Sequence, residues 1–198
     1  MSIHIDTLRS IKQETGCSVL FETGLSRGEG VARGLALGFE EIYSIELLEK
    51  FVSAGNAKFS EEISQGKVHI IPDDSANISK YLPELINKKV LFFLDAHLDN
   101  GLKTATTTPE SNCPILREIL ALSVFNIKPV VIVDDMRVIR GDYRWGHRSW
   151  GDSSVNEKKV IKAIRSLPFD YDINFLDSAP IDMGGVEVIL KNDLLVAK

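Results

Sequence analysis

Two short, unbroken apolar runs constrain the fold of this chain most. Residues 90–94 read VLFFL and residues 129–133 read PVVIV, and each run is followed at once by an aspartate. Apolar runs of this length without alternation are typical of strands that are buried on both faces, as in a parallel sheet. Strand-like and helix-like segments alternate along most of the remaining chain. The sequence therefore predicts an α/β fold in which helices cover both faces of a mostly parallel sheet.

The order of these segments predicts a Rossmann-like, doubly wound sheet of seven strands in one domain, residues 1–198. We expect the C-terminal strand to run antiparallel at or near an edge, and residues 1–16 to form an N-terminal helix or lid. The expected strands cover residues 18–21, 42–45, 68–71, 90–94, 129–133, 171–176 and 186–190. The expected helices cover residues 2–14, 28–37, 48–60, 76–86, a segment opened by Pro114, and a segment capped by Ser153 or Ser154 that ends near Leu167.

The overall composition disfavours several kinds of partner. A net charge of −5 and a pI of about 5.4 argue against the basic face that general nucleic-acid binding requires. No segment resembles a signal peptide, and no apolar run approaches the roughly 20 residues of a membrane span. We therefore expect a soluble, cytoplasmic protein. The two cysteines, Cys17 and Cys113, predict neither a disulfide framework nor a zinc site, and Cys17 is expected in the core.

Three carboxylates follow the two apolar runs, Asp95 after the first and Asp134 with Asp135 after the second. Ligands of open α/β sheets bind beyond the carboxyl ends of the strands, so neighbouring strands would bring these groups together. Two charges about 4 Å apart repel by roughly 4 kcal/mol at an effective dielectric constant near 20, a cost that a cation relieves. Oxygen ligands suit Mg²⁺ or Mn²⁺, and the sequence does not choose between them.

A glycine-rich turn follows the first expected strand and reads ETGLSRGEG over residues 22–30. Its glycine spacing differs from the dinucleotide-binding G-x-G-x-x-G pattern. Gly24 would let the backbone approach a ligand, and Gly28 would let the next helix begin beside it. The charge of Glu22 suits a ligand with a cationic amine better than a pyrophosphate.

Acidic and hydroxyl residues also follow the second and third expected strands. Glu46 lies 22 residues after Gly24, where a carboxylate can accept the hydroxyls of a ribose. Asp73, Asp74 and Ser75 lie where a purine edge could be bound. The alternative for these three residues is the N-cap of the following helix.

Together these motifs resemble class I S-adenosylmethionine-dependent methyltransferases over about residues 17–136. The resemblance implies a cofactor site for S-adenosyl-L-methionine. The aspartates after the fourth and fifth strands resemble those of metal-dependent O-methyltransferases that act on catechols and antibiotic sugars, which implies Asp95, Asp134 and Asp135 as metal ligands. The implied cofactor residues are Glu22, Gly24, Ser26, Gly28, Glu46, Asp74, Ser75 and Asp95.

The same resemblance assigns catalytic roles to Asp95 and His97. The sugar enzymes carry a D-G-D pattern whose second acid is a proposed general base, and His97 takes that position here. A neutral imidazole can accept a proton near pH 7, and Asp99 is the rival base. The catechol enzymes carry a lysine at the position of Leu98, so their mechanism is not reproduced residue for residue.

Two long polar loops, residues 97–113 and 137–151, are expected on the acceptor side. Within the second loop, Tyr143, Arg144, Trp145 and His147 suit stacking on a sugar ring, and the same composition suits a contact between copies in a homo-oligomer. We therefore expect methylation of a small-molecule hydroxyl, with a saccharide or glycan favoured. The alternatives are a nucleotide-sugar or dinucleotide enzyme on the same fold, a non-catalytic cofactor-binding module that regulates a partner, and an RNA ribose methyltransferase.

Overall fold

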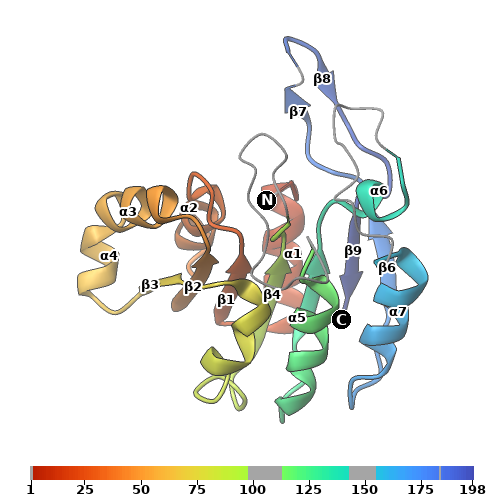
Figure 1. The fold of residues 1–198 in the computed structure, drawn as a ribbon, viewed down its shortest axis with the longest axis horizontal. Helices are drawn as coiled ribbons and strands as arrows, with labels where there is room; N and C mark the ends of the chain where they lie inside the picture. Colours follow the sequence, from red (N-terminus) through yellow and green to blue (C-terminus); the bar gives the residue numbers. More distant parts are fainter. Residues whose placement is uncertain (1, 98–112, 143–154, 183) are drawn as a thin grey trace.

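The computed structural model describes residues 2–97, 113–142, 155–182 and 184–198, and its core is a seven-stranded sheet (Figure 1). The strand order is β3-β2-β1-β4-β5-β9-β6. The strands are β1 (Val19–Thr23), β2 (Glu41–Glu46), β3 (Val68–Pro72), β4 (Val90–Leu94), β5 (Val130–Val133), β6 (Ile173–Leu176) and β9 (Leu194–Ala197).

The sheet is parallel except for β9, which pairs antiparallel with both β5 and β6. This topology confirms the predicted doubly wound α/β fold with an antiparallel C-terminal strand. β9 lies between β5 and the edge strand β6, which agrees with the predicted position at or near an edge. The register pairs Leu94 with Val133, so β4 and β5 are neighbours that end at the same edge of the sheet.

The strand expected at residues 186–190 does not join the main sheet. Glu187–Val188 forms β8, which pairs only with β7 (Ile181–Asp182) in a small hairpin that projects beyond the carboxyl ends of the strands (Figure 1). Val186 and Ile189 are exposed there, whereas all four residues of β9 are buried. Burial therefore selects Leu194–Ala197 as the seventh strand.

The helices largely follow the predicted order, with differences at their ends. They are α1 (Ile5–Thr15), α2 (Glu29–Ala36), α3 (Glu49–Lys58), α4 (Ser60–Ser64), α5 (Ile115–Ala121), α6 (Met136–Ile139) and α7 (Glu157–Arg165), with the 3₁₀ helices η1 (Ser75–Tyr81) and η2 (Leu122–Val124).

Three helix predictions need correction. The segment expected at residues 76–86 is the 3₁₀ helix η1, which ends at Tyr81, shortly before Pro83; proline has no backbone N–H with which to continue a helix. The segment expected at residues 48–60 is divided at Phe59 into α3 and α4. The helix expected to begin at Ser153 or Ser154 is capped instead by Asn156, whose side chain accepts a hydrogen bond from the backbone N–H of Lys159; the two serines lie outside the described residues.

The sheet separates two apolar clusters, and successive residues of a strand face opposite clusters. Val19 and Phe21 lie in the cluster beneath η1, α5 and α7, whereas Leu20 lies in the cluster beneath α1 and α2 (Figure 1). The same alternation directs Glu22 toward α2 and Thr23 toward the η1 and α5 layer. Two adjacent polar residues at the end of β1 therefore serve different sides of the molecule.

None of the helices in the described ranges combines the length and the apolar character that crossing a membrane requires.

Candidate functional site

The glycine turn after β1 lies directly against the loop after β4. Gly24 adopts φ +87°, and its N–H donates to the carbonyl of Ile45 at 2.9 Å. A Cβ atom at Gly24 would lie 3.1 Å from the carbonyl oxygen of Asp95. A side chain at this position would thus strain the backbone and crowd the neighbouring loop. The fold brings Gly24 and Asp95 together, and their shared role in cofactor binding stays a prediction.

Glu22 is buried beneath the first turn of α2. Its carboxylate accepts a hydrogen bond from the Ser44 hydroxyl at 2.8 Å, and only 2% of the residue is exposed. A Cβ atom at Gly30 would lie 1.6 Å from Oε2 of Glu22, so Gly30 provides the space that the carboxylate occupies. Burial raises the pKa of Glu22 to about 7. Its contact with a cofactor amine stays a prediction.

Glu46 joins the glycine turn to the end of β2. One carboxylate oxygen accepts the backbone N–H of Ser26, and the other accepts that of Leu48, both at 2.9 Å. Ser26 adopts a left-handed φ of +49°, which this hydrogen bond helps to hold. The structure therefore brings Ser26 and Glu46 together. Each carboxylate oxygen retains acceptor capacity for a ligand hydroxyl.

The acidic pair after β3 caps η1. Asp74 accepts the N–H of Ala76 at 2.8 Å, which is the capping alternative considered for this segment. Burial opposes ionisation of Asp73, but hydrogen bonds from Tyr81, Asn77 and Lys80 outweigh it and lower the pKa to about 2. Asp73 is thus ionised, and its carboxylate is bound by side chains of η1. Capping does not exclude a second role for Asp74, whose carboxylate can accept more than one hydrogen bond.

The carboxylates after β4 and β5 divide into two clusters that share Asp135. One cluster joins Asp95, His97 and Asp135, and the other joins Asp134, Asp135 and Asp193; within each, ligand atoms lie within 4.8 Å of one another. Nε2 of His97 is 2.8 Å from Oδ2 of Asp135 and 3.9 Å from Oδ1 of Asp95. The predicted set of Asp95, Asp134 and Asp135 does not form one cluster at this spacing.

Asp134 is directed toward the N-terminal segment. Its carboxylate accepts the backbone N–H of Ser2 at 2.9 Å, the Ser2 hydroxyl, and the N–H of Asp135 at 2.8 Å. Burial raises the pKa of Asp134, and repulsion from Asp95 and Asp135 adds to the increase. Residues 2–15 are thereby tied to the acidic edge of the sheet.

Asp135 is held by a buried arginine that the sequence did not single out. The guanidinium of Arg137 lies 2.7 Å from Oδ1 of Asp135 and also pairs with the carboxylate of Asp193, which has no solvent exposure. The backbone N–H of Arg137 donates to Asp193 at 3.0 Å. Asp135 itself adopts a left-handed φ of +55°. Asp193 escaped sequence analysis because it precedes β9, the strand that was missed.

A third missed residue is Glu118, on the buried face of α5. It has no solvent exposure, and burial raises the pKa of its carboxyl to about 8. A signal for it exists in the sequence, because Glu118 lies at helical spacing between the apolar residues Ile115 and Leu122.

The donor set of Asp95, His97 and Asp135 is chemically suited to a divalent ion. Two carboxylates and an imidazole are ligands that Mn²⁺ and Zn²⁺ accept readily, whereas Mg²⁺ prefers oxygen ligands alone. Arg137 engages Oδ1 of Asp135, which leaves Oδ2 facing His97 and Asp95. Among the described residues, these three side chains fit an ion better than the predicted three aspartates.

The predicted acceptor residues Tyr143, Arg144, Trp145 and His147, and the alternative base Asp99, lie outside the described residues.

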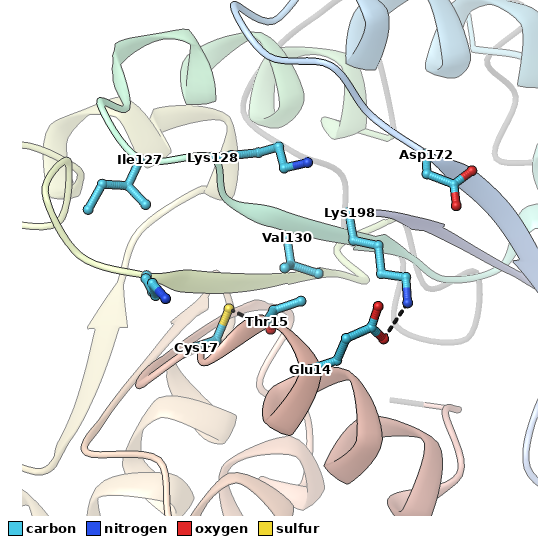
Figure 2. A pocket seen from close by; sticks show the side chains of 9 residues that line it. Glu14, Thr15, Cys17, Ile127, Lys128, Val130, Asp172 and Lys198 are labelled. Carbon is cyan, nitrogen blue, oxygen red and sulfur yellow. Dashed lines mark hydrogen bonds and ion pairs between the residues drawn. The ribbon is translucent and has the colours of Figure 1, made fainter.

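A cavity of about 340 Å³ lies at the other end of the sheet, near the amino ends of β1 and β5 (Figure 2). Cys17 lines it, receives a hydrogen bond from the Thr15 hydroxyl at 3.2 Å, and is buried, as predicted. Burial raises the pKa of this thiol and so lowers its reactivity. Lys198 and Glu14 form an ion pair in the cavity wall. This cavity is separate from the acidic edge.

The described fold is that of solved methyltransferases. A proposed caffeoyl-CoA O-methyltransferase from Staphylococcus aureus superposes with a TM-score of 0.63 at 14% identity, covering 98% of this chain and 81% of that chain. The chain has the fold of class I methyltransferases. An O-methyltransferase from Bacillus cereus, solved in complex with S-adenosylhomocysteine, gives a TM-score of 0.58 at 14% identity over 98% of this chain and 79% of that chain.

A proposed rRNA methylase from Clostridium thermocellum gives a TM-score of 0.60 at 14% identity over 100% of this chain and 98% of that chain. The sequence matches no protein-family model and no curated protein. Structural likeness at these identities establishes the fold, and one fold supports many substrates.

Proposed function

We propose that this protein is an S-adenosylmethionine-dependent O-methyltransferase that acts on a hydroxyl group of a small molecule. The observation that carries the proposal is the close packing of the Gly24 turn against the Asp95 loop, at the carboxyl edge of a methyltransferase fold. Glu46 closes the same region from β2. Ligands of open α/β sheets bind at this edge.

Different residues around this turn would contact different parts of the proposed cofactor. The backbone near Gly24 and Gly28 would approach the methionine part, Glu46 would accept the ribose hydroxyls, and Asp74 with Ser75 would border the adenine. Asp95 lies beside the turn, where its carboxylate would face the sulfonium end of the cofactor. Since the sulfonium methyl group is already electrophilic, the protein chiefly has to hold and aim the acceptor oxygen, which can contribute up to about 7–11 kcal/mol.

We further propose that the site uses a divalent metal ion held by Asp95, His97 and Asp135. A bound ion would lower the pKa of an acceptor hydroxyl and orient a second hydroxyl of the same substrate. Asp134, one of the originally expected ligands, instead holds Ser2. The imidazole makes Mn²⁺ a better candidate than Mg²⁺.

His97 is proposed both as a metal ligand and as the general base, and one ring nitrogen cannot serve in both roles. Its Nε2 faces both carboxylates, so this atom is the one that would bind the ion. A ring nitrogen that ligates a metal has no lone pair with which to accept a proton. If His97 is a ligand, the proton passes to another base, and Asp99 is the candidate from the sequence.

The acceptor is proposed to be a saccharide or glycan hydroxyl, on the strength of the Tyr143–His147 composition and the net charge of −5. A cytoplasmic location and homo-oligomerisation stay expectations of the sequence.

Calorimetric titration of S-adenosylhomocysteine tests the cofactor class. We expect micromolar binding in EDTA, and at least a tenfold weaker affinity in Glu46→Ala, because the ribose hydroxyls lose their acceptor. Glu49→Ala is the matched control: it removes the same charge from an exposed position three residues further on. No binding by the wild type, with titration instead by NAD or a nucleotide sugar, would replace the methyltransferase proposal with its first rival.

Turnover then identifies the acceptor. Saccharides, catechols and a structured RNA are offered with S-adenosylmethionine, each with Mn²⁺, with Mg²⁺ and with EDTA. Methylation of a saccharide that depends on Mn²⁺ is the expected result. Methylation of the RNA alone would refute the small-molecule proposal, and undiminished turnover in EDTA would refute the metal.

A further inference from the structure

Glu118 is a buried acid that the proposed mechanism does not use. The side chain leaves α5 for the layer beneath η1, is fully buried, and neither carboxyl oxygen makes a hydrogen bond of normal geometry within the described residues. A buried polar group without a hydrogen bond lowers the stability of the fold, so an apolar residue here would give a more stable helix packing. Such local losses of stability are expected chiefly at functional sites.

The groups around Glu118 come from both the turn after β3 and the loop after β4. The hydroxyls of Thr23 and Ser75 face its carboxyl and favour the charged form, whereas Asp74 and Asp95 lie close enough to disfavour that form. Thr23 ends β1, Ser75 begins η1, and Asp95 follows β4. Glu118 therefore lies where the loops after three strands meet.

Thr23 connects Glu118 to the loop after β4, which begins at Asp95. Its hydroxyl oxygen accepts the backbone N–H groups of Asp95 at 3.1 Å and of Ala96 at 3.3 Å. With its oxygen used as an acceptor, the hydroxyl proton of Thr23 needs an acceptor of its own, and the carboxyl of Glu118 faces it. The orientation of the Thr23 hydroxyl then fixes the two amides that begin the Asp95–His97 segment.

We propose that Glu118 is a positioning residue that holds the loop after β4 and the turn after β3 in the geometry for cofactor binding, acting through the hydroxyls of Thr23 and Ser75. The cofactor part of this inference rests on the proposed function; the ordering of the loop does not. In this role the carboxyl of Glu118 would accept from the two hydroxyls that face it, and so would tie η1 to the Asp95 loop from beneath.

Two substitutions of Glu118 separate this role from a purely structural one. Glu118→Gln keeps the shape and an acceptor oxygen, and Glu118→Leu keeps the approximate volume but removes all hydrogen bonding. We expect Glu118→Leu to unfold at the same or a higher denaturant concentration than the wild type, because it removes a buried polar group. We expect the same variant to bind S-adenosylhomocysteine at least about tenfold more weakly, and Glu118→Gln to restore most of that affinity.

Hydrogen exchange provides a readout that needs no cofactor. The amides of Asp95 and Ala96 should exchange roughly tenfold faster in Glu118→Leu, and near the wild-type rate in Glu118→Gln. Thr23→Val should produce the same acceleration, and adding Glu118→Leu to it should produce little more, because both changes break one link. Thr23→Ser, which keeps the hydroxyl, is the control.

The outcomes distinguish this inference from the proposed function. If the wild type fails to bind S-adenosylhomocysteine but the two amides lose protection in Glu118→Leu, the function is wrong and the loop-positioning role stands. If the wild type binds and Glu118→Leu changes neither affinity nor exchange, the function stands and the role of Glu118 is refuted. Parallel losses of stability, affinity and protection in both Glu118 variants would also refute it, since they would indicate a structural residue.

Discussion

Replacing Gly30 with alanine sets two opposing effects against each other within α2. Helix propensity alone predicts stabilisation by about 1 kcal/mol, since alanine is the better helix former. The geometry predicts the reverse, because the new Cβ atom would lie 1.6 Å from Oε2 and 2.7 Å from Cδ of Glu22. Glu22 cannot simply swing into solvent, because it is buried and bound to Ser44.

The magnitude follows from what Glu22 must give up. Overpacking costs about 2 kcal/mol, and a buried carboxyl that loses the Ser44 hydrogen bond costs about 2 kcal/mol more. Against a gain of about 1 kcal/mol from propensity, we expect Gly30→Ala to lower the free energy of unfolding by about 3 kcal/mol. Urea unfolding at neutral pH measures this change, provided that the dependence on urea concentration keeps its slope.

Repeating the substitution in a Glu22→Ala variant tests whether Glu22 causes the clash. In Glu22→Ala the obstructing carboxylate is gone, so Gly30→Ala should be neutral or stabilising by up to about 1 kcal/mol. Gly34→Ala is the control on the same helix: its Cβ would meet Leu20 and Ile42 at 2.7 and 2.9 Å, so it should destabilise both backgrounds equally. An equal loss from Gly30→Ala in both backgrounds would refute the assignment of the clash to Glu22.

Three further predictions concern Glu118, His97 and Arg137. The carboxyl of Glu118 has a pKa raised from 4.5 to about 8, so between these pH values the folded state binds more protons than the unfolded state. This contribution to stability is full below about pH 4.5 and is lost as the pH rises through about 8. The free energy of unfolding, measured by urea titration, should therefore decline less over that range in Glu118→Gln. His97→Gln should weaken Mn²⁺ binding at least about tenfold by calorimetry and leave the weaker Mg²⁺ binding little changed; unchanged Mn²⁺ affinity would return His97 to the role of base. Arg137→Met should cost about 3–5 kcal/mol in urea unfolding because Asp193 is left buried without its cation, and Arg137→Met with Asp193→Leu should recover most of that loss; no recovery would mean that the ion pair is not the cause.

The cluster shared by Asp135 explains why two residues outside the motifs matter. Arg137 fixes one oxygen of Asp135 and depends on Asp193 for its own burial. A left-handed backbone at Asp135 costs about 1–3 kcal/mol and persists only when its surroundings hold it. The Arg137–Asp193 pair supplies that support and directs the second oxygen toward His97.

The sequence by itself determined the elements whose causes are local. Continuous apolar runs fix buried strands, and in a parallel sheet the residue that follows such a strand lies at the carboxyl edge. Asp95, Asp134 and Asp135 could therefore be placed at that edge without coordinates, and the Gly24 turn could be placed beside it. The fold class followed from the same alternation of segments.

Only the tertiary structure decided which of these groups face one another. Asp134 turns to Ser2, a residue 132 positions away, and Asp193 reaches the site because β9 inserts between β5 and β6. Side-chain direction at the end of a strand depends on partners that arrive from distant parts of the chain, and no local pattern encodes them. For that physical reason the side chains that cluster are Asp95, His97 and Asp135 and not the three expected aspartates, and the buried position of Glu118 between three loops arises in the same way.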